Sequence, residues 1–528
     1  MTGMGGLTVR GWWLRGAAVV LAVVLVAGVP VLSSGADIYV HLLWAHQVMR
    51  CLAVGELPLW APDLNAGFGS PGIRLYSPAG PVTAGLLGLV PGDAAAGLRL
   101  ALLLAIVALV LVVRRRSGSI LPAFLILCGA PFLGDLIVRA AWSQMLAVPV
   151  AWWLLEQVAD ERRPVADPAA VGVGMAALWL VHAPTAVMVG VLLGLGGLLR
   201  LGPLAALRWA GTWGVFGAAL TAWHWLPLLS EMPLTAAREG LTGGIFDPAA
   251  NWLGAPWPHG PRLNLAYSAA ATVLALFVAA ALRKGPDRPG NVRTILATGA
   301  LSLTTVLVIP LSALGLPLAW LQFPWRWLTP AALLLAIPAA RVIRDHPVAF
   351  LVWLVPVLLL PPVAPMPAPH LGPSDGWIRM GEAVSEFGGN PLVVDAIQNR
   401  PRWYPGLAKA IPEFGEAGLV CSWPASVVRV VSWRPLRRVV RIRSASGCRL
   451  ELRLLRYPWW RLTLDGRIVP LPEQGAVIGL DVPPGEHVVR CQWGGNPLAR
   501  VGLAIAAAML LLLTVLRLRR DGPASSAP

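Results

Sequence analysis

The sequence predicts an all-α polytopic membrane protein with about twelve transmembrane helices and a small β-sandwich-like domain before the last helix. The 528-residue chain is 56% hydrophobic and only 13% charged, about half the charged fraction of an average soluble protein. Its mean hydropathy is +0.67. Continuous apolar runs approach the roughly 17–25 residues that cross a bilayer, and basic residues gather between these runs.

The apolar runs are continuous rather than alternating, which favours helices over a membrane β-barrel. Clear examples are 16–32, 98–113, 265–282 and 498–516. Other runs, such as 120–133 and 327–340, are short for a membrane span, so the helix count has a margin of roughly two.

The net charge of +16 comes largely from basic clusters in alternate loops, which is the positive-inside pattern rather than a nucleic-acid-binding face. This alternation predicts a multi-pass protein of the plasma (inner) membrane with both termini in the cytoplasm. A cleaved N-terminal signal peptide is the alternative for the first run. The loops predicted to face out, where the chemistry is expected, are 33–95, about 131–143, 182–184, 231–264, 314–326 and 364–497.

Three domains are predicted: a membrane domain over 1–363 that includes the first outer loop, an extracytoplasmic β-rich domain over 364–497, and the last helix with a cytoplasmic tail over 498–528. β-Branched or alternating stretches indicate strands, and Asp465-Gly466 is a hairpin turn signal. Cys448 and Cys491 lie on candidate strands, where a disulfide and two buried thiols are both compatible with the pattern.

The first outer loop contains an acid and a histidine at helical spacing. Asp37 follows the first apolar run, and His41 lies four residues later, on the same face of a helix. A carboxylate at the membrane edge can act as a general base because desolvation raises its pKa. Asp37 is therefore the candidate base, and His41 could orient it, bind phosphate or ligate a metal. A solvated helix-end acid and an interfacial histidine are the alternatives.

Three arginines, Arg74, Arg139 and Arg326, lie on the predicted outer side, against the positive-inside trend. A guanidinium can bind phosphate through two parallel hydrogen bonds, and contact with lipid headgroups is the alternative. His182 precedes Pro184 at a helix end, where it could cap a break at membrane depth. Glu231 ends a helix at the predicted outer surface.

Short motifs follow one another in order along nearly the whole chain. They are Asp37 with His41, Gly55–Trp60, Gly69–Pro71, Tyr76–Pro78, Arg139–Gln144, His182–Thr185, Trp225–Pro227 with Glu231, and Gln322–Arg326. This order resembles bacterial membrane proteins labelled as 6-pyruvoyl-tetrahydropterin-synthase-related, and the first loop resembles that of the GT-C glycosyltransferases. The tail 457–487 is similar to the outer β-domain of a related group thought to glycosylate lipoteichoic acid. No histidine cluster for a catalytic zinc supports the pterin label.

The resemblance implies a GT-C-like membrane glycosyltransferase that moves a sugar from a polyprenyl-phosphate donor to an extracytoplasmic glycan or lipid acceptor. The catalytic residues would be Asp37 and His41. Substrate or phosphate would be bound by Arg74, Tyr76, Arg139, Gln144, His182, Glu231 and Arg326. The implied partners are membrane lipids, the lipid-linked sugar and the glycan acceptor, without nucleic acid.

Two departures from the resemblance leave catalysis and metal use open. Gln144 stands where many members carry Glu, and Ile38 and Tyr39 stand where many GT-C enzymes carry a second acid. No cofactor is indicated beyond the donor, and a divalent metal is left open. The alternatives are a non-catalytic glycan-binding membrane protein of the same fold and a lipid-linked saccharide transporter or flippase.

Overall fold

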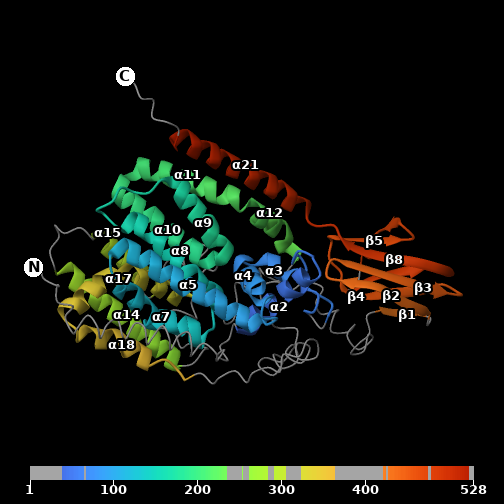
Figure 1. Ribbon diagram of the computed structural model, residues 1–528, viewed down its shortest axis with the longest axis horizontal. Helices are drawn as coiled ribbons and strands as arrows, with labels where there is room; N and C mark the ends of the chain where they lie inside the picture. Colours follow the sequence, from blue (N-terminus) through green and yellow to red (C-terminus); the bar gives the residue numbers. More distant parts are fainter. Residues whose placement is uncertain are drawn as a thin grey trace, which may run out of the picture. The chain divides into compact units, whose positions relative to one another are not determined.

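The computed structural model describes residues 38–64, 67–234, 253, 261–283, 291–304, 323–362, 420–423, 426–473 and 477–521. These residues are mostly helical, and the strands lie in the C-terminal part of the chain (Figure 1). The chain divides into two compact units. The helical unit comprises 1–38, 98–218 and 242–367, and the mixed unit comprises 39–97, 219–241 and 368–528.

Helices form nearly all of the described helical unit. In chain order they are α5 (Ala94–Ser117), α6 (Leu121–Leu127), α7 (Ala130–Leu133), the π-helix η1 (Gly134–Val138), α8 (Trp142–Ala159), α9 (Pro168–Val181), α10 (Ala183–Leu201), α11 (Pro203–Leu220), α14 (Pro261–Leu282), α15 (Asn291–Thr304), the 3-10 helix η6 (Pro324–Trp327), α17 (Leu328–Asp345) and α18 (Ala349–Leu358).

Five helices in the described chain are long and apolar enough to cross a membrane: Ala94–Ser117, Ala183–Leu201, Arg262–Leu282, Pro324–Asp345 and Pro497–Leu518. A sixth candidate is the pair α6 and α7–η1, which is bent by 45°. These helices indicate a membrane protein, but twelve spans and a GT-C fold are not confirmed. Three further apolar helices among the described residues, Pro168–Val181, Val292–Thr304 and Ala349–Leu358, have 10–17 residues, too short for a straight span. The run 327–340, short in the sequence, forms part of the candidate span Pro324–Asp345. The first apolar run and both chain ends lie outside the described residues.

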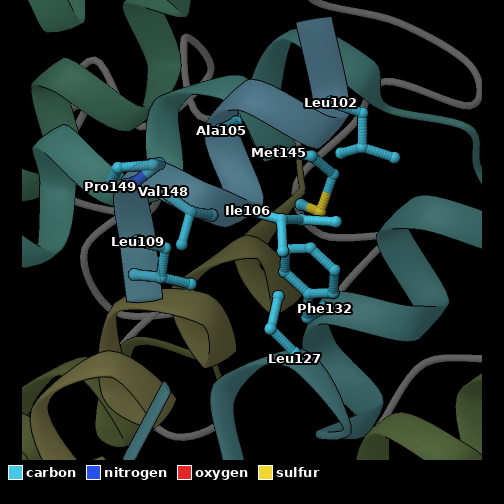
Figure 2. Close-up of a pocket in the computed structure, with 9 residues that line it drawn as sticks. All are labelled: Leu102, Ala105, Ile106, Leu109, Leu127, Phe132, Met145, Val148 and Pro149. Atoms are coloured by element: carbon cyan, nitrogen blue, oxygen red, sulfur yellow. The ribbon is translucent and has the colours of Figure 1, made fainter. Parts of the chain in front are cut away.

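The core of the helical unit is apolar. The candidate span Pro324–Asp345, which contains α17, is the most enclosed one in the described chain, because 78% of its most apolar stretch is buried. Beside it, α5 to α8 surround a narrow hollow (Figure 2). Its lining is entirely apolar: Leu102, Ala105, Ile106, Leu109, Leu127, Phe132, Met145, Val148 and Pro149. Because no polar side chain lines it, this hollow offers no chemistry.

The mixed unit combines short helices with two antiparallel sheets. Its helices are α2 (Ile38–Ala53), α3 (Gly72–Leu75), α4 (Ala79–Gly88), α12 (Ala222–Glu231), the 3-10 helix η2 (Met232–Leu234) and α21 (Pro497–Asp521). Its strands are β1 (Val420–Trp423), β2 (Val427–Arg434), β3 (Arg437–Ser444), β4 (Cys448–Leu455), β5 (Trp460–Leu464), β6 (Arg467–Val469), β7 (Val477–Val482) and β8 (Gly485–Trp493).

The strands form sheets of order β1-β4-β7 and β2-β3-β8-β5-β6. Alternate residues of both sheets, such as Val440 and Leu452, share one core. The predicted β-rich region before the last helix is therefore confirmed. Cys448 and Cys491 lie in different sheets as buried free thiols, which decides between the two alternatives that the sequence left open.

The segment predicted as the first outer loop, which was expected in the membrane domain, contributes to the core of the β region. Trp60 and Phe68 are fully buried there. Gly69 has φ +82°, and a β-carbon added to it would lie 2.0 Å from Nε1 of Trp60. The backbone of Phe68 also accepts a hydrogen bond from Leu455 N at 2.8 Å. Glycine is needed at 69 because the ring occupies the space of a side chain.

Helix α21 contacts α12 at a glycine. A β-carbon added at Gly502 would lie 2.4 Å from backbone atoms of Ala222. We expect Gly502→Ala to lower the thermal unfolding temperature of the detergent-solubilised protein, because backbone must move to accept the methyl group. The matched control is Gly211→Ala in α11, where a β-carbon meets nothing within 4 Å. This control should gain up to about 1 kcal/mol from helix propensity. Equal effects of the two substitutions would contradict the close contact.

The Asp465-Gly466 hairpin turn is confirmed, with φ of 49° and 82°. Asp465 Oδ2 lies 2.6 Å from Nδ1 of His487, and its Oδ1 accepts a hydrogen bond from Val488 N at 2.8 Å. These bonds lower the pKa of Asp465, and the hydrogen bond to Asp465 raises the pKa of His487 above its ordinary 6.5.

The ion pair between Asp465 and His487 should therefore stabilise the hairpin fully below pH 6.5 and weaken as pH rises through the raised histidine pKa. It should weaken again only in acid, as pH falls through the lowered pKa of Asp465. We expect Asp465→Asn to return the NMR-measured pKa of His487 toward 6.5. Glu486→Gln removes a neighbouring acid as a control, and an equal shift in that variant would show general charge rather than this bond.

Candidate functional site

The helical unit contains a buried carboxylate surrounded by donors. Asp135, in η1, is 2% exposed. Its Oδ1 accepts hydrogen bonds from Arg139 Nη1 at 2.7 Å and from the Tyr267 hydroxyl at 3.3 Å. Its Oδ2 accepts from Gln144 Nε2 at 2.5 Å and from the Thr329 hydroxyl at 3.2 Å. We call these five residues, together with Phe323, Trp325 and Arg326, the Asp135 cluster.

The backbone that positions Asp135 and Arg139 has two unusual conformations. The chain passes from α7 into a π-helical turn, and Ala140 then has φ 55°, which is unfavourable for a residue with a β-carbon. Gly134 lies under the Tyr267 ring, since a β-carbon at 134 would be 2.7 Å from its hydroxyl. π-Helical turns and positive φ at non-glycine residues are frequent at functional sites.

Aromatic rings face both arginines of the cluster. The guanidinium carbon of Arg139 lies 4.3 Å from the ring centroid of Trp325 and 5.6 Å from that of Phe323. Arg326 lies 4.6 Å from the same Phe323 centroid. Trp325 stacks in turn on Tyr267, at 5.2 Å. The two guanidiniums thus lie at one phenyl ring, in a setting that favours cations.

The hydrogen bonds that Asp135 accepts determine what the cluster can do chemically. Four donors use the acceptor capacity of Asp135, so it acts as a counter-ion that fixes Arg139 rather than as a proton acceptor. Gln144 supplies a neutral NH₂ donor where a glutamate would place a second negative charge beside Asp135. A guanidinium held in this way, with that of Arg326 at the same phenyl ring, is suited to a phosphate or diphosphate group.

A second buried carboxylate organises the mixed unit. Glu231, at the end of α12, is 0% exposed. Both guanidinium nitrogens of Arg74 bind it, one of them at 2.6 Å, and it also accepts from the Tyr457 hydroxyl and from Asn496 Nδ2 at 2.7 Å. Burial, and then the Glu231 charge, raise the pKa of Tyr457 far above its ordinary value, so the phenol remains a donor. Arg74 also lies 5.0 Å from the ring of Trp493.

Five of the nine residues selected from the sequence, Glu231 among them, fall into these two groups. The Asp135 cluster contains Arg139, Gln144 and Arg326, and the Glu231 group contains Arg74. Since the members of each group lie in one compact unit, each group is an arrangement within that unit. The predicted base, Asp37, lies outside the described residues.

The other predicted residues take local positions. His41 is buried in α2. Tyr76 has its ring 5.3 Å from that of Trp44, and its carbonyl lies 2.9 Å from Nε2 of His224. His182 lies at the break between α9 and α10, where its Nδ1 accepts a hydrogen bond from Thr185 N at 3.3 Å. His182 therefore caps a helix, as the following proline indicated.

Sequence reasoning missed Asp135, Tyr267 and Thr329. Asp135 is an isolated acid at the end of an apolar run, in the loop 131–143 that was predicted to face out, four residues before Arg139. That spacing allows an ion pair on one helix face, and an acid at membrane depth is a functional candidate by default. Tyr267 and Thr329 had no local signal, because they meet Asp135 across 132 and 194 residues. In the part of the chain that the structure describes, no group of three or more His, Cys, Asp or Glu could hold a metal.

Comparisons with protein-family models, curated proteins and solved structures gave no match for this chain. The interpretation of both groups therefore depends on their own chemistry.

We expect Asp135→Asn to destabilise the protein by about 3–5 kcal/mol, because Arg139 would lose its buried counter-ion. Chemical unfolding in detergent measures this loss. The double variant Asp135→Asn/Arg139→Gln should recover part of it, since no uncompensated charge is then left. If the double variant is destabilised by the full sum of the single variants, the two residues are not an energetic pair.

Proposed function

We propose that the protein is a membrane glycosyltransferase that transfers a sugar from a polyprenyl-phosphate donor to an acceptor outside the cytoplasm. The observation that supports this most directly is the Asp135 cluster, in which two arginines lie at one aromatic ring within a unit of candidate membrane helices. Buried charges are costly in such a setting and are usually retained for function.

The proposed roles follow from the contacts. Arg139 and Arg326 bind the donor phosphate and stabilise the negative charge that develops on it as the sugar leaves. Asp135, with Gln144 and Thr329, holds Arg139 in place. Asp37 remains the sequence-based candidate for the base that takes the proton from the acceptor hydroxyl.

The architecture proposed with this function is GT-C-like, with both termini in the cytoplasm and the β region outside. In this arrangement the β region would lie on the acceptor side of the membrane. The donor is the only small molecule that the proposal needs, and chelation of divalent metals during the transfer assay tests metal use.

Transfer of labelled sugar from a polyprenyl-phosphate donor, measured in proteoliposomes, tests the role of Arg139. Arg139→Lys should lower transfer on the order of 10–100-fold, because lysine keeps the charge but loses the planar fork. A matched control is Arg293→Lys, which alters another buried ion pair of the helical unit, where Arg293 binds both oxygens of Glu156. If both variants lose equal activity per folded molecule, the Asp135 cluster has only a structural role.

The role of Asp37 is tested by Asp37→Asn in the same assay. Loss of a general base should reduce transfer by about 10²–10⁴-fold while the amount of folded protein is unchanged. Wild-type transfer would remove Asp37 from the mechanism. Donor binding without any transfer by the unaltered protein would favour the non-catalytic alternative.

A further inference from the structure

The outer face of the five-stranded sheet is covered with arginine. Along β3, Val440 and Ile442 point into the shared core, whereas the alternate residues Arg437, Arg441 and Arg443 are exposed. The strand register continues this face onto β2, β5 and β8. Its exposed arginines are Arg429, Arg434, Arg437, Arg441, Arg443, Arg461 and Arg490.

This arrangement does not serve the stability of the sheet. Arg429 stands directly opposite Arg441, and Arg434 stands opposite Arg437, and like charges in such cross-strand positions are destabilising. Three described acids lie at the edges of this face, fewer than its arginines. Glu486 lies 3.7 Å from Arg441, and Asp465 accepts a hydrogen bond from Val488 N. Glu56 accepts a hydrogen bond from Leu436 N in the turn between β2 and β3. The excess of arginine over acid makes this face suited to bind an anion from outside the chain.

The outer face of the three-stranded sheet shows the contrast. There Arg449 stands opposite Asp481, with their side chains 3.4 Å apart, and lies 3.7 Å from Glu451. The same fold therefore pairs its arginine with two acids on one sheet and gathers more arginines than acids on the other.

The densest row lies at the end of the sheet that leads into the last helix. Arg434, Arg437 and Arg461 align across the strands with Gln492, one residue before β8 ends. The candidate membrane helix α21 starts at Pro497 (Figure 1). Four residues span at most about 14 Å from Trp493 to this helix.

Contacts with the linker place the row beside the start of α21. A β-carbon added at Gly494 would lie 2.8 Å from Nε of Arg461. The exposed Arg500, in the first turn of α21, donates from Nη2 to the Gly494 carbonyl at 3.4 Å. Glu486 lies at the opposite end of β8, and the one described acid bound at the row is Glu56, which is hydrogen-bonded to Leu436 N. Positive charge is thus concentrated where the chain would enter a bilayer.

We propose that Arg434, Arg437, Arg461 and Arg500 form a binding site for anionic phospholipid headgroups at the surface of the bilayer that α21 enters. Each guanidinium donates parallel hydrogen bonds to a lipid phosphate. Basic residues beside an anionic leaflet each strengthen association about fivefold. This inference is independent of the proposed glycosyl transfer, since it needs only that α21 crosses the membrane.

The height of the sheet above the bilayer tests this site in the full chain. A donor fluorophore is attached at Gln492→Cys, and the protein is placed in nanodiscs that contain a trace of lipid carrying an acceptor dye on its headgroup. Energy transfer should rise with the fraction of phosphatidylglycerol, fall with salt, and stay low in phosphatidylcholine. Labelling of the unsubstituted protein gives the background from native cysteines, four of which are buried.

Two triple variants, each lacking three arginines, are compared in the protein that carries Gln492→Cys. The row variant Arg434→Gln/Arg437→Gln/Arg461→Gln should lower the preference for phosphatidylglycerol on the order of 100-fold. The control Arg429→Gln/Arg441→Gln/Arg443→Gln, on the distal rows of the same face, should retain it. Thermal unfolding checks that both variants are folded, and both relieve a cross-strand arginine pair.

Three results would overturn the proposal. The first is an equal loss in both triple variants, which would show a diffuse field over the whole face. The second is no dependence on phosphatidylglycerol in the unsubstituted protein. The third is tight binding of soluble polyphosphate that both variants weaken alike while the lipid dependence is absent, which would identify a soluble polyanion as the occupant.

Discussion

The mixed unit depends on one buried carboxylate, that of Glu231. A fully buried charge is tolerated only when it is paired and hydrogen-bonded, and its partners come from three distant segments. Arg74 belongs to the first loop, Tyr457 to the β region and Asn496 to the start of the last helix. The positions of all three segments relative to α12 are therefore tied to the same charge.

The helical unit also contains an arginine held by a buried acid, but the surroundings of that arginine differ. In both units an arginine is held by a buried acid and lies against aromatic rings: Arg74 against Trp493, and Arg139 against Trp325. Around Arg74 the contacts join segments of the fold. Around Arg139 a π-helical turn, a positive φ and a second arginine accompany the pair. The turn, the positive φ and the second arginine distinguish the Asp135 cluster, a candidate ligand site, from the contacts of Arg74, which are structural.

Local pattern was sufficient for some elements and failed for others. The strands β2 to β6 and β8, the Asp465-Gly466 turn and the capping role of His182 could be predicted because each depends on neighbouring residues. The strands β1 and β7, which flank β4, were not predicted. The number of spans could not, because apolar composition does not reveal where a helix of 10–17 residues ends. The burial of Trp60 in the β region and the contact of Tyr267 with Asp135 depend on distant segments, which periodicity does not encode.

The Glu231 contacts also set a condition on synthesis. Asn496 follows Glu231 by 265 residues, and Tyr457 follows it by 226. At about 5–20 residues per second, a ribosome needs roughly 10–50 s to add them. During that interval only Arg74, among the partners described, has already been made. The nascent chain must therefore hold an acidic helix end in an unfinished environment, and the first loop and α12 can complete their arrangement only when translation is nearly over.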